Sequence, residues 1–139
     1  MGTQKQVSNG APGSGEDPAE APVLVVEDDR QVRQVLQLAL EDEGVVVETA
    51  ADGQQALTVA SAHPPAIIVL DLMLPRKDGV EVAHELRSLC GRDIPIIMIT
   101  AASQATEKAR QMDAVAYFYK PFPLEGVLSC VQYLLQHRH

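Results

Sequence analysis

Short apolar runs alternate along this chain with stretches in which apolar residues recur at helical spacing, and this alternation sets the fold class. The runs predict five strands, over residues 23–26, 45–49, 66–70, 94–99 and 114–118. Helices are predicted between and after them, around residues 32–40, 54–62, 81–89, 104–112 and 124–136. Strands that are apolar on both faces and alternate with helices are typical of a parallel sheet covered on both sides. We therefore predict an α/β protein with a doubly wound, five-stranded parallel sheet and five helices.

The predicted helices carry their own end signals. Asp29 and Asp78 precede helices at positions where a carboxylate can accept hydrogen bonds from the first free backbone N–H groups. Gly44 follows the first helix where a left-handed C-terminal cap is expected. On the third helix, the periodicity places Leu89 on the same apolar face as Val82.

Residues 1–21 differ from the rest of the chain, because they are rich in Gly, Pro, Ser and charge and show no apolar period. This composition predicts a disordered tail or linker. Residues 22–139 then form one domain, since a chain of 139 residues has room for a single core. A second catalytic domain would not fit.

Charge and hydropathy exclude several classes of function. The formal net charge is −8 and no cluster of five or more Lys and Arg occurs, so direct nucleic-acid binding is not expected. No stretch approaches the ~18 consecutive apolar residues of a membrane span, and the N-terminus does not have the pattern of a signal peptide. We expect a cytoplasmic protein without a membrane partner.

Cys90 and Cys130 lack the spacing of a metal or redox motif and are predicted to be reduced packing residues.

Polar residues stand where the predicted strands end, and this edge is where ligands bind in open parallel sheets. Glu27 and Asp28 follow the first strand, Asp71 the third and Thr100 the fourth, while Lys120 lies just past the fifth. Asp29 belongs to the same acidic run, but we interpret it as a helix cap. Since the first and third strands are normally neighbours, two or three carboxylates are expected to converge.

Converging carboxylates need a counter-charge, because two like charges at ~4 Å repel by about 4 kcal/mol at an effective dielectric of 20. A bound cation and a paired Lys are two ways to relieve this repulsion. A pocket of carboxylate oxygens suits Mg²⁺, or Mn²⁺, far better than zinc. An Asp can accept a phosphoryl group as an acyl phosphate, while a Thr hydroxyl and a Lys ammonium can stabilise that group.

A resemblance to a known family rests on four stretches that occur in this order: VLVVEDD, IIVLDLMLPRKDG, IIMIT and YFYKPF. Together they resemble the response-regulator receiver family over roughly residues 23–137, although each alone is a weak signal. The resemblance implies the flavodoxin-like, CheY-like strand order 2-1-3-4-5. It also implies a phosphoacceptor domain of a two-component phosphorelay.

The resemblance further implies a role for each strand-end residue. Asp71 corresponds to the phosphoacceptor. The ligands of Mg²⁺ correspond to Glu27, Asp28 and Asp71, together with the backbone carbonyl of Met73. Lys120 is implied to contact the phosphoryl group.

Two further positions correspond to the family's switch. Thr100 is implied to hydrogen-bond the phosphoryl group and to draw its loop inward. Tyr117 corresponds to the aromatic residue that swings inward as the Thr moves. The family also tends to have a cis peptide bond before the residue that corresponds to Pro121.

The implied partners are a sensor histidine kinase or a histidine phosphotransfer protein, and a downstream output protein or domain. The output partner would recognise the face formed by the fourth helix, fifth strand and fifth helix, and a homodimer is a further possibility. The domain would be regulatory rather than an enzyme, catalysing only its own phosphoryl transfer and slow dephosphorylation. Slow loss of the phosphoryl group is predicted because neither Met73 nor Ala102 can orient an attacking water.

The sequence departs from the family pattern ahead of the fifth strand. Tyr117 comes only 17 positions after Thr100, fewer than in most family members, and Asp113-Ala114 replaces the usual Gly-Ala. We therefore predict a short or displaced fourth helix.

Three other functions match parts of the sequence. The first is an interaction module on the same fold that does not depend on phosphorylation. The second is a Mg²⁺-dependent phosphatase of the haloacid-dehalogenase type, which requires an Asp at the position of Met73. The third is a histidine kinase, suggested by the sequence from His84 to Arg87, but the chain has no room for the kinase domains.

Overall fold

The computed structural model describes residues 21–101, 103 and 105–137, which form one α/β unit. The five strands are β1 (Val23–Val26), β2 (Val47–Ala50), β3 (Ile67–Asp71), β4 (Ile96–Thr100) and β5 (Ala116–Tyr119). The five helices are α1 (Arg30–Asp42), α2 (Gly53–Ala62), α3 (Gly79–Cys90), α4 (Ala105–Gln111) and α5 (Leu124–Gln136).

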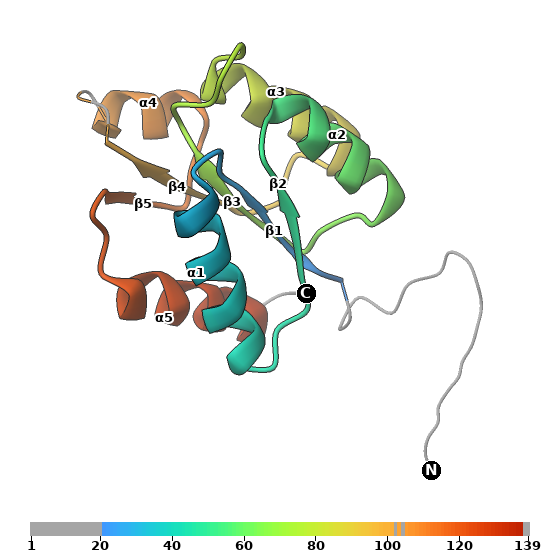
Figure 1. Ribbon diagram of the computed structural model, residues 1–139. Coiled ribbons are helices and arrows are strands. Elements are labelled where there is room, and N and C mark those ends of the chain that lie inside the picture. Colours follow the sequence, from blue (N-terminus) through green and yellow to red (C-terminus); the bar gives the residue numbers. More distant parts are fainter. Residues whose placement is uncertain (1–20, 102, 104, 138–139) are drawn as a thin grey trace.

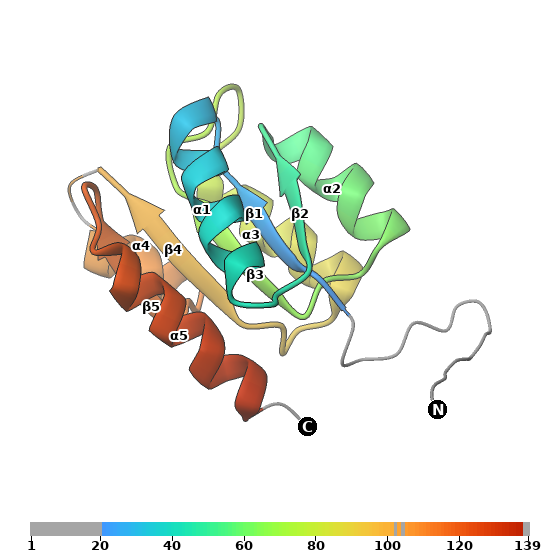
Figure 2. The same ribbon diagram turned by 60° about the horizontal axis from the view of Figure 1, so that its bottom comes forward.

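The strands form one sheet in the order β2-β1-β3-β4-β5, and every neighbouring pair is parallel. Helices α1 and α5 cover one face of the sheet, while α2, α3 and α4 cover the other (Figure 1). Figure 2 brings the α1 and α5 layer forward. The predicted fold class and strand order are therefore confirmed.

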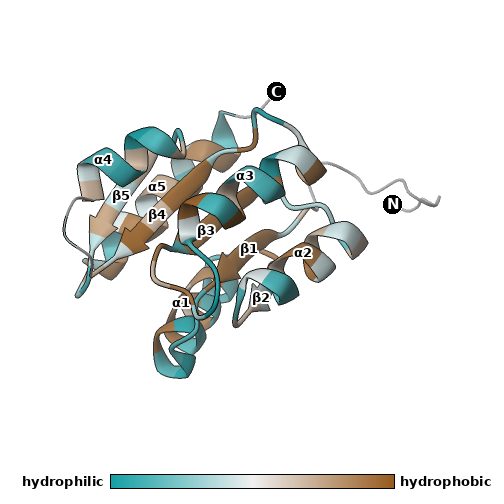
Figure 3. Ribbon diagram, turned by 90° about the horizontal axis from the view of Figure 1, so that it is seen from above, coloured by the Kyte–Doolittle hydropathy of each residue, from teal (hydrophilic) through white to brown (hydrophobic). Residues whose placement is uncertain are grey.

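The core lies in two apolar clusters, one on each face of the sheet. All residues of the three central strands β1, β3 and β4 are buried, whereas the edge strands β2 and β5 are half-buried. Figure 3 shows the central strands as hydrophobic ribbons between helices that have one hydrophobic and one hydrophilic side. Burial on both faces explains why the central strands are continuous apolar runs rather than alternating ones.

The predicted end signals are found in the structure. The Asp29 carboxylate accepts from the backbone N–H groups of Gln31 and Val32, and the Asp78 carboxylate accepts from that of Val80. Gly44 has a φ of +86°, the left-handed conformation that favours Gly. One prediction was wrong in part, because Leu89, placed on the apolar face of α3, is 47% exposed near the end of that helix.

The predicted strand starts of β2, β4 and β5 were also wrong, since each begins two residues later than predicted. The residues at the predicted starts are Val45, Ile94 and Ala114. Their backbone N–H groups bond to Leu40, Gly91 and Ala109 at or just after the preceding helix, not to a neighbouring strand. An apolar run indicates that its residues are buried, and these three residues are at least partly buried. It does not indicate which groups their backbone N–H groups bond to.

Helix α4 is short, with seven residues, as the reduced spacing predicted. The predicted first residue of this helix, Gln104, lies outside the described residues. Asp113, which stands where the family has Gly, has a φ of +54°. Asp is among the few residues other than Gly that adopt this conformation readily, so the replacement preserves the turn into β5.

The two cysteines are free and half-buried, and burial raises the pKa of both thiols. Cys90 packs against the core cluster under α2, α3 and α4, and Cys130 packs against the cluster under α1 and α5. Their positions on opposite faces of the sheet agree with the predicted packing role.

Within the described part of the chain, none of the helices has both the length and the apolar character needed to cross a membrane. Of the predicted tail, residues 1–20 lie outside the described residues.

Candidate functional site

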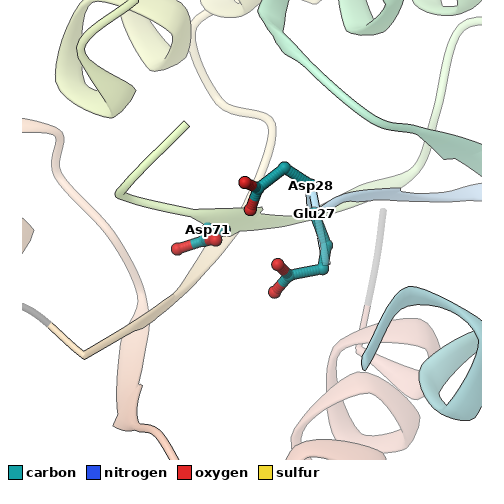
Figure 4. Close-up of side chains that lie close together, drawn as sticks. All are labelled: Glu27, Asp28 and Asp71. Carbon is teal, nitrogen blue, oxygen red and sulfur yellow. The ribbon is translucent and has the colours of Figure 1, made fainter. Parts of the chain in front are cut away.

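Three carboxylates meet at the carboxyl end of the sheet. Glu27 and Asp28 follow β1 directly, and Asp71 is the last residue of the adjacent strand β3. One carboxylate oxygen from each residue lies within 4.8 Å of the others. Figure 4 shows Glu27 and Asp28 leaving the end of β1 with their carboxylates on the side of Asp71. The predicted convergence of acidic side chains is therefore present, and we call these three residues the acidic cluster.

Glu27 is completely buried. Its Oε2 accepts a hydrogen bond of 2.9 Å from the backbone N–H of Asp29, and its Oε1 lies 2.8 Å from the Nζ of Lys120. Burial raises the pKa of Glu27 to about 7, although Lys120 and the Asp29 N–H lower it in part, and the nearby Asp71 carboxylate raises it further. A further positive charge, in addition to that of Lys120, would therefore favour the ionised form of this carboxyl group at neutral pH.

Asp71 is 2% exposed and is held from two sides. Its Oδ1 accepts from the backbone N–H of Met73 at 3.0 Å, and its Oδ2 accepts from Lys120 Nζ at 3.1 Å. Lys120 thus bridges two members of the acidic cluster. Burial lowers the pKa of Lys120, but the Glu27 and Asp71 carboxylates outweigh that effect and leave the pKa raised.

Thr100 and Tyr117 lie on the neighbouring strands. Thr100 ends β4, is completely buried, and accepts the backbone N–H of Lys120 through its carbonyl at 2.8 Å. Tyr117 on β5 is 38% exposed, and its hydroxyl lies 2.8 Å from that of Thr106 on α4. Tyr117 also makes an edge-to-face contact with Tyr119. Thr100 is therefore bonded to the residue that bridges the acidic cluster, while Tyr117 points toward α4 and solvent.

The loop after Asp71 returns tightly to α3. The backbone N–H of Gly79 donates to the carbonyl of Leu72, and Met73 pairs with Asp78 in an isolated bridge. A Cβ atom at Gly79 would lie 2.5 Å from the Leu72 carbonyl oxygen, which is too close for any side chain. The Asp78-Gly79 pair therefore serves turn geometry, and Asp78 caps α3 as predicted. The peptide bond between Lys120 and Pro121 is cis, as the resemblance implied.

The donor set of the acidic cluster fits a hard divalent cation. All three side chains offer oxygen, and their formal charge of −3 is only partly balanced by Lys120. The buried Glu27 Oε1 forms an ion pair with Lys120 Nζ at 2.8 Å and has no further partner among the described residues. Asp28 is exposed, which leaves the cluster open to solvent. These are the features of a Mg²⁺ site rather than of a closed structural ion pair.

The structure leaves two sequence expectations open and adds a residue. The backbone N–H of Met73 contacts Asp71, but the role of its carbonyl as a metal ligand stays a prediction. Ala102 lies outside the described residues.

Sequence reasoning missed Arg33, whose guanidinium donates to the backbone carbonyls of Glu27 and Asp28. The available signal was a cation in the first turn of a helix that follows an acidic run.

Comparison with known proteins places residues 23–132 under a family model described as the response regulator receiver domain. Response regulator MprA of Mycolicibacterium vanbaalenii and of Mycobacterium ulcerans are each 44% identical to this chain over 116 residues. That alignment covers 82% of this chain and 50% of each relative. The chain therefore spans about half the length of the curated relatives it matches.

Solved structures give the same assignment of fold. The chemotaxis protein CheY4 of Vibrio cholerae is 32% identical with a TM-score of 0.75, covering 82% of this chain and 98% of that one. The Francisella response regulator 1452 receiver domain is 27% identical with a TM-score of 0.74, covering 84% of this chain and 97% of that one.

Proposed function

Since this chain belongs to the response regulator receiver domain family of two-component signalling, we propose that it is switched by transfer of a phosphoryl group to Asp71 with the help of bound Mg²⁺. The observation that carries the proposal is the meeting of the acidic cluster with Lys120 at the carboxyl end of the sheet. This arrangement combines a nucleophilic carboxylate, oxygen ligands for a cation, and an ammonium group at one point.

The metal ion would be held by Glu27, Asp28 and Asp71 with the backbone carbonyl of Met73. A bound Mg²⁺, or Mn²⁺, would neutralise the phosphoryl oxygens during transfer. An Asp71 carboxylate oxygen attacks the phosphorus of a phosphohistidine on the donor. The new O–P bond forms as the N–P bond breaks, and the imidazole nitrogen leaves with the electron pair. Lys120, already within 3.1 Å of Asp71, provides a positive charge for the acyl phosphate.

The proposed switch uses Thr100 and Tyr117. Thr100 would hydrogen-bond the phosphoryl group, and Tyr117 would move inward from its exposed position beside Thr106. Because Tyr117 lies on β5 next to α4, its movement would alter the face formed by α4, β5 and α5. The short α4 gives this face its particular shape in this chain.

The partners follow from the same proposal. A sensor histidine kinase or histidine phosphotransfer protein would supply the phosphoryl group, and an output protein or domain would recognise the altered face. The domain would be regulatory, catalysing only its own phosphoryl transfer and a slow dephosphorylation. Met73, 57% exposed beside Asp71, carries no group that could orient a hydrolytic water.

The test is to incubate the protein with acetyl phosphate, with and without Mg²⁺, and to measure its intact mass. We expect one added phosphoryl group on the wild type with Mg²⁺, and none on Asp71→Asn or in excess chelator. The matched control is Asp93→Asn, an exposed carboxylate on the α3–β4 loop, which should be phosphorylated like the wild type. No added mass on the wild type, together with an unchanged NMR spectrum in beryllofluoride, would instead support an interaction module that does not depend on phosphorylation.

A further inference from the structure

The turn that carries two of the three carboxylates is held by a side chain from α1. The Nη1 atom of Arg33 lies 2.9 Å from the carbonyl oxygen of Glu27 and 3.4 Å from that of Asp28. Arg33 lies in the first turn of α1 and is half-buried, so its guanidinium reaches back toward the end of β1. One side chain thus connects the helix to the backbone of both acidic residues.

Other contacts fix the two ends of the turn and the Glu27 side chain, whose Oε2 accepts from the Asp29 N–H, but they do not hold the Glu27 and Asp28 carbonyls. The N–H of Glu27 bonds to Ala50 at the end of β2, which fixes the start of the turn. The Asp29 carboxylate caps α1, and the Asp29 carbonyl accepts the Arg33 N–H, which fixes its end. Between these two points, the carbonyls of Glu27 and Asp28 bond to the Arg33 guanidinium. Rotation of either peptide unit would move a carboxylate away from Asp71.

We infer that Arg33 is a positioning residue of the proposed metal site, which aims the Glu27 and Asp28 carboxylates at Asp71 by holding the backbone between them. The inference rests on the proposed function. Arg33 contacts the turn on its backbone side and has no role in binding the cation itself. Groups that orient metal ligands in this way commonly change metal affinity by 10-fold or more when they are removed.

The direction in which cation affinity changes when Arg33 is removed distinguishes a positioning role from a simple electrostatic effect. Removing a positive charge near a cation site strengthens cation binding, because a repulsive interaction is lost. Loss of positioning weakens binding instead, because the carboxylates no longer converge. Arg30 is an exposed cation on the same helix, and among the described residues no hydrogen bond joins its side chain to the turn. Arg30→Gln is therefore the matched control for charge alone.

The experiment measures Mn²⁺ binding to the full chain from the electron paramagnetic resonance signal of free Mn²⁺. We expect Arg33→Gln to raise the dissociation constant about tenfold. Arg30→Gln should leave it unchanged or lower it slightly. Arg33→Lys, which keeps the charge but has a shorter side chain than the one that brings Nη1 to the two carbonyls, should give an intermediate value. Circular dichroism establishes that each variant is folded.

The outcomes distinguish this inference from the proposed function. Binding by Arg33→Gln that is as tight as that of Arg30→Gln would overturn the positioning role while leaving the metal site in place. Absence of Mn²⁺ binding by the wild type would overturn both. If Arg33→Gln does not fold, Arg33→Met provides the same test, because it keeps the aliphatic stem but has no donor. Binding by that variant as tight as that of Arg30→Gln would overturn the inference.

Discussion

Glu27 is a buried carboxylic acid whose burial, opposed in part by Lys120 and the Asp29 N–H, raises its pKa from 4.5 to about 7. Between these two values the folded protein holds more protons at this group than the unfolded chain does. The free energy of unfolding therefore falls as the pH rises through this window, by at most about 1.4 kcal/mol per pH unit from this group. In metal-free buffer, we expect wild type to lose stability relative to Glu27→Gln from about pH 4.5 to about pH 7. Urea unfolding curves at several pH values measure that difference.

The same residue links pH to metal binding. A cation binds the ionised carboxylate, so added Mg²⁺ should restore stability above about pH 7 and have little effect near pH 4.5. Glu48→Gln, at a half-buried carboxylate on β2, is the control for loss of one negative charge away from the acidic cluster. A stability difference between wild type and Glu27→Gln that does not vary with pH would contradict the raised pKa.

At the scale of elements, α3 is joined to two loops by Arg87. Its Nη1 donates to the carbonyls of Arg92 and Ile94 before β4, at 2.7 and 2.9 Å. Its Nη2 donates to the carbonyls of Met112 and Asp113 between α4 and β5, at 3.1 and 2.9 Å. This half-buried guanidinium therefore fixes the start of one strand and the end of the shortened helix.

Loss of the Arg87 guanidinium would leave four carbonyls without their donor. We expect Arg87→Met to lower the free energy of unfolding by about 2–4 kcal/mol, because hydrogen bonds from charged donors are stronger than neutral ones and two of the carbonyls are partly buried. Arg92→Met removes the same charge from an exposed position, so it should change stability by less than about 0.5 kcal/mol. Equal losses in the two variants, measured by urea unfolding, would show that the bonds contribute little.

Apolar periodicity predicts the number, order and type of these elements because it reflects burial, and the central strands are buried on both faces. It does not predict the starts of β2, β4 and β5, because the buried or partly buried residues Val45, Ile94 and Ala114 bond to residues at or just after helix ends. The strand-end positions of Asp71 and Lys120 are likewise visible in the sequence. Arg87 acts through backbone carbonyls, which have no sequence signature. For Arg33 the sequence shows only a cation in the first helical turn after an acidic run, so the contacts of both residues require the structure.

At the scale of the whole molecule, the described residues already contain a sheet with both faces covered by helices. The sequence predicts that residues 1–21 add nothing to this core. We therefore expect deletion of residues 1–20 to change the melting temperature by less than about 2 °C, a shift equivalent to well under 1 kcal/mol for a domain of this size. Differential scanning calorimetry of both proteins makes the comparison, and a larger drop would mean that the segment packs on the domain.

The chain contains no Trp and three Tyr, of which Tyr117 and Tyr119 lie on β5 and Tyr133 on α5. Tyr117 and Tyr119 meet edge to face, and Tyr133 stacks on His137. The tyrosine fluorescence of the protein must therefore arise from these two elements alone. A change in emission on phosphorylation would report directly on the β5 and α5 side of the molecule, without an added dye or an engineered chromophore.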